Sequence, residues 1–221
     1  MRAQVSVLRY DAEELRERAR TRLHQNAPLE ASDLTLTAPS GDDDLNAHLP
    51  PSAADGPGRA AAVLVPIVRR GADLAVLLTL RTDHLPSHGG QICFPGGKIE
   101  DSDEGPLDAA LREAHEETGL DPGLVEPLGY LDIYQTRSGY RIIPVVGLVD
   151  PAARFSPAAG EVADLFEVPL RFLMDPVNHL QESRMWRGVE RRFYAMPYGE
   201  RYIWGATAGM LKKLYDRLYA G

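Results

Sequence analysis

The chain has 221 residues, of which 44% are hydrophobic and 25% are charged, and its formal net charge is -8. These proportions are ordinary for a globular protein, and the length allows one domain with a substantial core plus extensions. A broad nucleic-acid surface neutralises phosphates with an excess of Lys and Arg, which this acidic chain lacks. We therefore expect no nucleic-acid partner.

The cellular setting is inferred from the cysteine count and the apolar runs. Cys93 is the single cysteine, so no intrachain disulfide forms and a reducing cytosol is favoured. The simplest interpretation of Cys93 is a small residue in a buried strand. No run approaches the roughly 18 apolar residues of a membrane-spanning helix, and the N-terminus lacks a secretion signal pattern. We expect a cytoplasmic protein with no membrane partner.

The N-terminal part is expected to be an extension. Asp11 and Glu14 have the spacing of a capping box, and a thin apolar stripe follows them, so residues 1–25 are predicted to hold one packing or dimer-contact helix. Residues 26–59 are rich in Ala, Pro, Ser, Asp and Gly, which predicts a linker or covering loop. Its acidic run at 42–44 is expected to be solvated and not to bind metal.

From Ala60 onward the chain alternates between apolar segments and turns. A buried strand is predicted over 60–68, and a closing helix with an apolar face over 206–219. Mixed strands with a few helices fit an α/β/α sandwich, so we divide the chain into an extension, 1–59, and a main domain, 60–221. The other predicted strands or strand-and-turn segments are 74–81, 124–133, 141–149, 161–170, 180–187, 189–196 and 202–204.

The stretch from Phe94 to Leu120 contains a glycine turn, an acidic loop and a short helix. Pro106 suits the first helical turn and Gly119 suits the position just past the helix end. Three glutamates at i, i+3 and i+4 share one side of this helix, and Arg112 is the only Lys or Arg within it. A divalent cation would relieve their repulsion, because hard oxygen ligands suit Mg²⁺ or Mn²⁺. The alternative is a solvated acidic face. The three residues are Glu113, Glu116 and Glu117.

This stretch resembles the signature of the Nudix hydrolases, which is Gly, five residues, Glu, seven residues, then R-E-U-x-E-E-x-G-U with U apolar. R-E-A-H-E-E-T-G-L at 112–120 fits, and Glu104 stands at the expected distance before it. The gap from Gly97 to Glu104 is one residue too long, and Asp103 stands at the spacing counted from the glycine. Whether Asp103 or Glu104 fills the position of the loop carboxylate is left open.

The resemblance implies an α/β/α sandwich of the Nudix type with a mixed sheet. It also implies that Arg112 ties the acidic loop to the helix through hydrogen bonds. The cation, Mg²⁺ or Mn²⁺, would be held by the helix glutamates, with Glu113 and Glu117 assigned most securely and Glu116 close behind.

Three further stretches resemble the coenzyme A pyrophosphatase branch of this family. They are L-L-T-L-R leading to F-P-G-G over 77–97, E-V-A-D-L-F-E-V-P-L over 161–170, and I-W-G-A-T-A over 203–208. Thr82 and Pro86 depart from the pattern, which has Ser or Ala and then Arg at these places. The resemblance implies hydrolysis of coenzyme A and its thioesters to 3',5'-ADP and (acyl-)4'-phosphopantetheine.

Several residues flanking the helix have two interpretations each. Glu161 suits an added metal ligand or general base, or else a surface carboxylate before a strand. Arg81 suits a bidentate phosphate contact, or else an ion pair within the protein, and Lys98 is a second anion-contact candidate. The Gly96-Gly97 turn belongs to the substrate-binding segment. Trp204 suits stacking on a base, or else a place in the core.

Two other functions stay open at this point. One is a Nudix hydrolase acting on another nucleoside diphosphate derivative, such as ADP-ribose or a dinucleotide. The other is a non-catalytic nucleotide-binding module, which the presence of all three helix glutamates disfavours. A homodimer contact is also left open.

Overall fold

The computed structural model of the chain describes residues 8–28, 38, 40–50, 58–84, 89–186 and 188–220. The helices and 3-10 turns are α1 (Ala12–Arg22), η2 (Asp42–Leu45), α2 (Pro106–Thr118), η3 (Pro122–Leu124), α3 (Leu170–Leu173), η4 (Pro176–Asn178) and α4 (Ala206–Leu218). The strands are β1 (Ser40–Gly41), β2 (Arg59–Arg70), β3 (Asp73–Arg81), β4 (Ile92–Cys93), β5 (Gly96–Lys98), β6 (Val125–Tyr130), β7 (Tyr134–Gln135), β8 (Tyr140–Val149), β9 (Val162–Pro169), β10 (Leu180–Trp186), β11 (Val189–Tyr198) and β12 (Arg201–Trp204).

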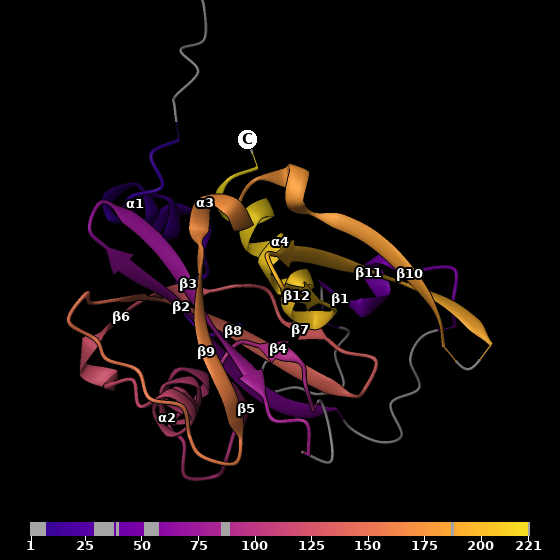
Figure 1. Ribbon diagram of the computed structural model, residues 1–221, viewed down its shortest axis with the longest axis horizontal. Helices are drawn as coiled ribbons and strands as arrows, with labels where there is room; N and C mark the ends of the chain where they lie inside the picture. Colours follow the sequence, from indigo (N-terminus) through magenta and orange to yellow (C-terminus); the bar gives the residue numbers. More distant parts are fainter. Residues whose placement is uncertain are drawn as a thin grey trace, which may run out of the picture.

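Strand β2 lies at the centre of a mixed sheet that has nine strands in the described part of the chain (Figure 1). It pairs in parallel with β8 and antiparallel with β3, while the short β5 pairs with its first half. β9 pairs antiparallel with β3 on the far side. A second, antiparallel sheet has the order β10-β11-β12.

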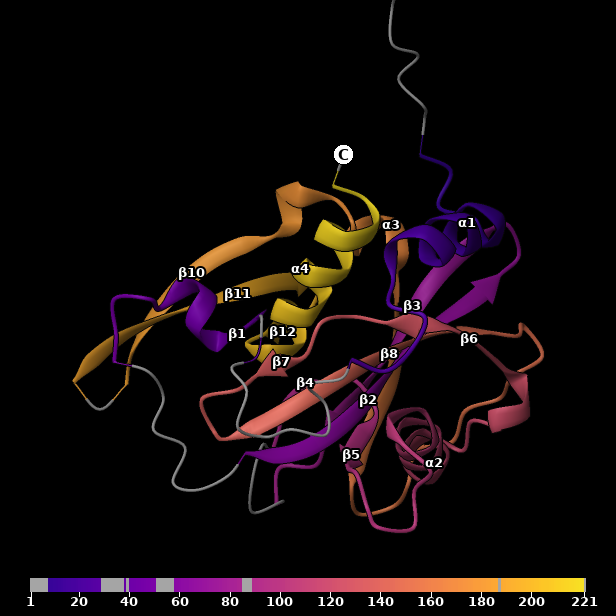
Figure 2. The ribbon, with the colours of Figure 1, turned by 180° about the vertical axis from the view of Figure 1, so that it is seen from behind.

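The apolar run of β2 is buried on both faces, as expected for a central strand that helices cover on both sides. Alternate residues of β2 enter two separate cores. Ala62, Leu64 and Val68 pack with the α2 residues Ala109, Ala110 and Ala114. Val63, Val65 and Ile67 pack in the core that contains the buried residues of α1 and α4. Figure 2 shows α2 on one side of the sheet and α1 with α4 on the other, so the predicted α/β/α sandwich is confirmed.

The predicted N-terminal helix is present and packs on the main sheet and on α4. Its stripe of Leu15, Ala19 and Leu23 is buried in the core. Asp11 accepts a hydrogen bond from the Glu14 N–H, as a capping residue does. The Glu14 carboxylate does not complete the capping box, because it accepts from the N–H groups of Arg9 and Tyr10 instead.

The expectation that the acidic run at 42–44 is solvated is wrong for Asp42, while the side chains of Asp43 and Asp44 are 43% and 33% exposed. Asp42 accepts hydrogen bonds from the Tyr134 hydroxyl and from the Arg137 N–H, at 3.0 and 2.9 Å. Asp44 forms an ion pair with Lys213 of α4 at 2.7 Å. Composition alone indicated a loop, but partners distant in sequence supply the bonds that hold this turn against the domain.

The predicted strand over 124–133 is also shorter than expected. β6 ends at Tyr130, and β7 is a separate strand that pairs with β8 across the turn at 136–139. The register of β6 against β8 shifts between Pro127 and Gly129, which marks an irregularity. None of the helices in the described ranges is long and apolar enough to cross a membrane.

Candidate active site

The helix α2 carries the predicted glutamates and is placed by small residues. It begins with Pro106 and ends at Gly119, whose φ of 66° is the left-handed conformation that glycine adopts without strain. The small side chains of Ala109, Ala110 and Ala114 are fully buried against the sheet. Their small size lets the helix approach closely, so its polar side lies beside the short strand β5.

The glycine turn preceding α2 meets two of the glutamates directly. The N–H of Gly96 donates a hydrogen bond to Oε2 of Glu117 at 3.1 Å. A Cβ atom added at Gly97 would lie 2.3 Å from Oε1 of Glu113, a distance that real Cβ atoms do not tolerate. The two glycines therefore let the backbone of β5 approach both carboxylates, a physical reason for glycine at these positions.

Glu117 is a buried carboxylate with two hydrogen-bond donors. Its side chain is 5% exposed, and Arg81 at the end of β3 donates to its Oε1 at 3.0 Å. Burial raises the pKa of Glu117 to about 7, although the Gly96 N–H and the charge of Arg81 act in the opposite direction. Of the two interpretations of Arg81, the ion pair within the protein is the one seen in the structure.

Arg112 connects the acidic loop, the helix and β5. Its Nε and Nη2 donate to Oδ1 and Oδ2 of Asp103 at 2.8 and 3.0 Å. Nη2 also donates to the Lys98 carbonyl at 3.2 Å, and Nη1 contacts Glu113 and Glu116 at 3.1 and 3.3 Å. The loop-to-helix tie expected of Arg112 is thus present.

The structure distinguishes Asp103 from Glu104 in the acidic loop. The Asp103 side chain is 2% exposed, and its bidentate bond with Arg112 lowers the pKa of its carboxyl group. It also accepts from the Glu100 N–H at 2.7 Å. Glu104 is exposed, and among the described residues its backbone N–H, bonded to Asp108, is the group seen to be engaged. Asp103 therefore makes the carboxylate bond to the helix.

The loop before β9 brings Glu161 to the same edge of the sheet as Arg81. Thr82 joins the two segments, because its N–H donates to the Glu161 carbonyl at 3.0 Å and its Oγ1 donates to the Gly160 carbonyl at 2.9 Å. The Ala158 N–H donates to the Glu117 carbonyl at 3.0 Å, which fastens this loop to α2. The Glu161 side chain is exposed. Thr82, a departure from the branch pattern, thus has a structural role, while Pro86 lies outside the described residues.

The start of α4 is joined to the other side of β3 through β4. Thr207 donates from Oγ1 to the Ile92 carbonyl at 2.9 Å. The next residue, Cys93, is buried deeply enough that the pKa of its thiol rises to about 11. Trp204 is half-buried and packs edge-on against Phe193, with ring centroids 5.3 Å apart, so it has a packing role here.

The carboxylate oxygens of this site suit a hard divalent cation, although they are not gathered around one point in this structure. Among the described residues, no three His, Cys, Asp or Glu side chains are gathered as a metal cluster. Burial raises the pKa of Glu113, and the nearby charges of Glu116 and Glu100 add to this effect. A cation would relieve this excess of negative charge in competition with Arg81 and Arg112. The sequence did not identify Glu100 as part of this site, and its position in the acidic loop was the one available signal.

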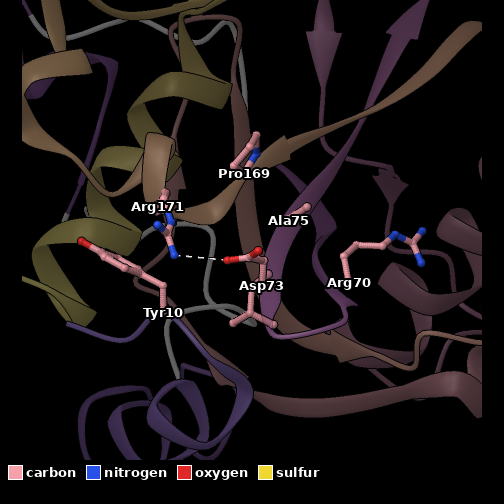
Figure 3. A pocket seen from close by; sticks show the side chains of 7 residues that line it. Tyr10, Arg70, Asp73, Ala75, Pro169 and Arg171 are labelled. Carbon is pink, nitrogen blue, oxygen red and sulfur yellow. Dashed lines mark hydrogen bonds and ion pairs between the residues drawn. The ribbon is translucent and has the colours of Figure 1, made fainter.

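A pocket of about 360 Å³ lies at the opposite end of β3 from Arg81 (Figure 3). Arg171 reaches toward Asp73 across it, at 3.2 Å, and Tyr10 lies beside this pair. Arg70 on its rim forms an ion pair with Glu167 at 2.5 Å. Because each of the charged residues lining this pocket forms an ion pair, the glutamate face of α2 is the better candidate site.

Comparison with known sequences assigns the family. The NUDIX domain profile matches residues 58–185. An Escherichia coli O7:K1 protein described as the uncharacterized Nudix hydrolase NudL is 40% identical over 156 residues, which cover 71% of this chain and 81% of that protein. The chain therefore belongs to the Nudix hydrolase family.

Solved structures align with the chain less closely. A Nudix hydrolase from M. smegmatis, RenU, is 27% identical with a TM-score of 0.40 and covers 50% of this chain and 70% of its own. The NUDIX domain of Shewanella oneidensis NrtR, solved with ADP ribose, is 19% identical with a TM-score of 0.46 and covers 79% of this chain and 97% of its own.

Proposed function

We propose that the chain is a metal-dependent hydrolase of coenzyme A and its thioesters. It would cleave the pyrophosphate bond to give 3',5'-ADP and (acyl-)4'-phosphopantetheine, in the cytoplasm. Membership of the Nudix hydrolase family supports hydrolysis of a pyrophosphate bond. The choice of coenzyme A as the substrate is supported by the positions of the three segments that resemble the coenzyme A pyrophosphatase branch.

Those three segments are neighbours in space, which is the observation that carries the proposal. Arg81 of the first segment pairs in register with Val162 of the second. Thr207 of the third is hydrogen-bonded to Ile92, which lies inside the first. The first segment ends at the glycine turn, whose Gly96 N–H binds Glu117. The first two segments thus lie beside the carboxylate helix α2, and the third is bonded to the first from the other side of the sheet, so segments far apart in sequence meet at one region.

The residues of this site divide the tasks of pyrophosphate hydrolysis. Mg²⁺ or Mn²⁺, when bound, neutralises the pyrophosphate oxygens and activates a water molecule. Glu113, Glu116 and Glu117 would hold the cation. Arg81, displaced from Glu117 by the cation, and Lys98 would contact the anionic substrate beside the Gly96-Gly97 turn. Arg112 would keep the acidic loop in place. The exposed carboxylate of Glu161, at the sheet edge, would act as general base or added ligand.

A substrate panel tests the branch assignment. We would measure kcat/KM on coenzyme A, dephospho-coenzyme A, ADP-ribose and NADH, each with Mg²⁺ and with Mn²⁺. The expected result is the highest kcat/KM on coenzyme A. A preference for ADP-ribose would contradict the coenzyme A proposal and favour a Nudix hydrolase that acts on another nucleoside diphosphate derivative. Binding of nucleotides without turnover of any compound would support the non-catalytic module.

The role of the helix is tested by Glu117→Gln. This change keeps the shape of the side chain but removes its negative charge, so we expect kcat on coenzyme A to fall at least about a hundredfold. Asp101→Asn removes one charge from an exposed position of the acidic loop and is the matched control, with near-normal kcat expected. Near-normal turnover by a correctly folded Glu117→Gln protein would contradict the metal assignment.

A further inference from the structure

Strand β10 forms an open edge of the smaller sheet. It pairs with β11, and within the described residues no strand pairs with its outer side. Every residue of β10 except Glu182 is exposed, and Figure 1 shows the β10–β11 hairpin extending away from the main sheet. An exposed edge of this kind presents unpaired N–H and C=O groups to another chain.

The orientation of these backbone groups follows from Asn46. Its side chain donates to the Arg192 carbonyl at 2.8 Å and accepts from the Arg192 N–H at 2.8 Å. Arg192 lies opposite Ser183, so these two residues are not a hydrogen-bonded pair of the β10–β11 ladder. The N–H and C=O of Ser183, and by alternation those of Gln181 and Met185, therefore point toward the open edge.

The side chains of β10 are arranged symmetrically about Ser183. Glu182 and Arg184 flank it, and Leu180 and Trp186 lie beyond them, 41% and 51% exposed. These four side chains share one face of the sheet, because side chains alternate along a strand. Along this face the side chains are apolar, acidic, basic and apolar. When two copies of the strand run antiparallel, each acidic side chain therefore lies opposite a basic one, and each apolar side chain lies opposite an apolar one.

We propose that the open edge of β10 joins β10 of a second copy of this chain, antiparallel and about a two-fold axis at Ser183. Glu182 of each copy then lies opposite Arg184 of the other, and Leu180 lies opposite Trp186. The two three-stranded sheets become one continuous sheet of six strands. This is an isologous interface, in which each contact occurs twice.

Charge selects this register over its neighbours. Moving the axis by one residue would put Glu182 opposite its own copy or Arg184 opposite its own copy. Like charges directly opposite each other destabilise an antiparallel pair, so both alternatives are disfavoured. The guanidinium of Arg191, which lies opposite Arg184 on β11, is 5.9 Å from the Trp186 ring centroid, so this ring lies on the same face of the sheet as Arg184.

Charge exchange tests the interface. By analytical ultracentrifugation we expect the full chain to form a dimer, and Arg184→Glu to weaken its Kd at least about tenfold, or 1.4 kcal/mol. The double variant Glu182→Arg with Arg184→Glu restores opposite charges and should restore the dimer. Glu190→Arg, on the inner strand β11, is the matched control and should leave the Kd unchanged. Circular dichroism confirms that each variant is folded.

A cross-link tests the register independently. Ser183→Cys places two thiols at opposed positions about 5.5 Å apart between Cα atoms, within the range of a disulfide. Mild oxidation should give a covalent dimer, while Glu200→Cys in the exposed β11–β12 turn should not, because the interface does not include it. The native Cys93 is half-buried in β4, outside the proposed interface. A wild-type chain that stays monomeric at all concentrations, an Arg184→Glu variant that associates normally, or equal cross-linking of both cysteine variants would overturn the proposal.

Discussion

Gly97 illustrates how one missing side chain shapes the candidate site. The Glu113 carboxylate occupies the place where a Cβ atom at position 97 would stand, 2.3 Å from Oε1. A methyl group there must displace the end of a flexible side chain, not backbone. We therefore expect Gly97→Ala to lower kcat/KM by roughly a hundredfold, because small displacements of catalytic groups cost about that much.

The melting temperature separates this effect from loss of the fold. The Glu113 side chain can move toward solvent, so we expect the Tm of Gly97→Ala to stay near that of the wild type. Gly105→Ser is the matched control: in the described part of the chain nothing lies within 4 Å of a Cβ at Gly105, and serine is a favoured residue at this helix N-cap. Normal activity in Gly97→Ala would show that the position of Glu113 is not needed.

At the scale of elements, the acidic loop depends on Asp103 and not on its neighbour. The Asp103 carboxylate accepts two hydrogen bonds from Arg112 and one from the Glu100 N–H. We expect Asp103→Ala to destabilise the protein by about 1–2 kcal/mol, because Arg112 loses a bidentate partner. This corresponds to a decrease in Tm of roughly 2–8 °C for a chain of this size.

Glu104→Ala is the control for this pair. The Glu104 side chain is exposed, and its backbone bond to Asp108 survives the change. We expect its Tm to match that of the wild type in the same thermal scan. An equal loss of Tm in both variants would mean that the loop does not distinguish these carboxylates as the structure indicates.

The elements that the sequence predicted best are those with a local signal. α2 has Pro106 and Gly119 at its ends, and the β10–β11 hairpin has Gly188 at its turn. The acidic run at 42–44 has no such signal. Its bonds go to Tyr134, Arg137 and Lys213, about 90 or more residues away, so only the folded chain reveals them.

The same contrast holds for the molecule as a whole and for its site. The apolar run of β2 and the stripe of α1 indicated buried surfaces, which correctly predicted a layered α/β fold. The motif placed Glu113 and Glu117 on one helix face, but no sequence pattern shows that Arg81 pairs with Glu117. That ion pair forms because the end of β3 lies beside the last turn of α2, and this placement depends on the topology of the folded chain.

The buried Glu117 connects the candidate site to the stability of the whole molecule. Its pKa rises from 4.5 to about 7 on folding, so between these pH values the folded chain holds more protons at this site than the unfolded chain. The free energy of unfolding should therefore decrease as pH rises through this window, by up to roughly 3 kcal/mol from this group. Below pH 4.5 the contribution is fully present, and above pH 7 it is lost.

Denaturant unfolding between pH 4.5 and 8, with a chelator present to exclude divalent cations, measures this dependence. Glu117→Gln lacks the titrating group, so its unfolding free energy should decrease less over the same window. Asp101→Asn is the matched control, because it removes one carboxylate from an exposed position of the acidic loop and should keep the wild-type slope. Identical slopes in the wild type and Glu117→Gln would show that burial of this carboxylate does not oppose its ionisation. A slope reduced only in Glu117→Gln would show that the folded state disfavours the ionised form of Glu117. A cation bound at α2 would offset this unfavourable free energy.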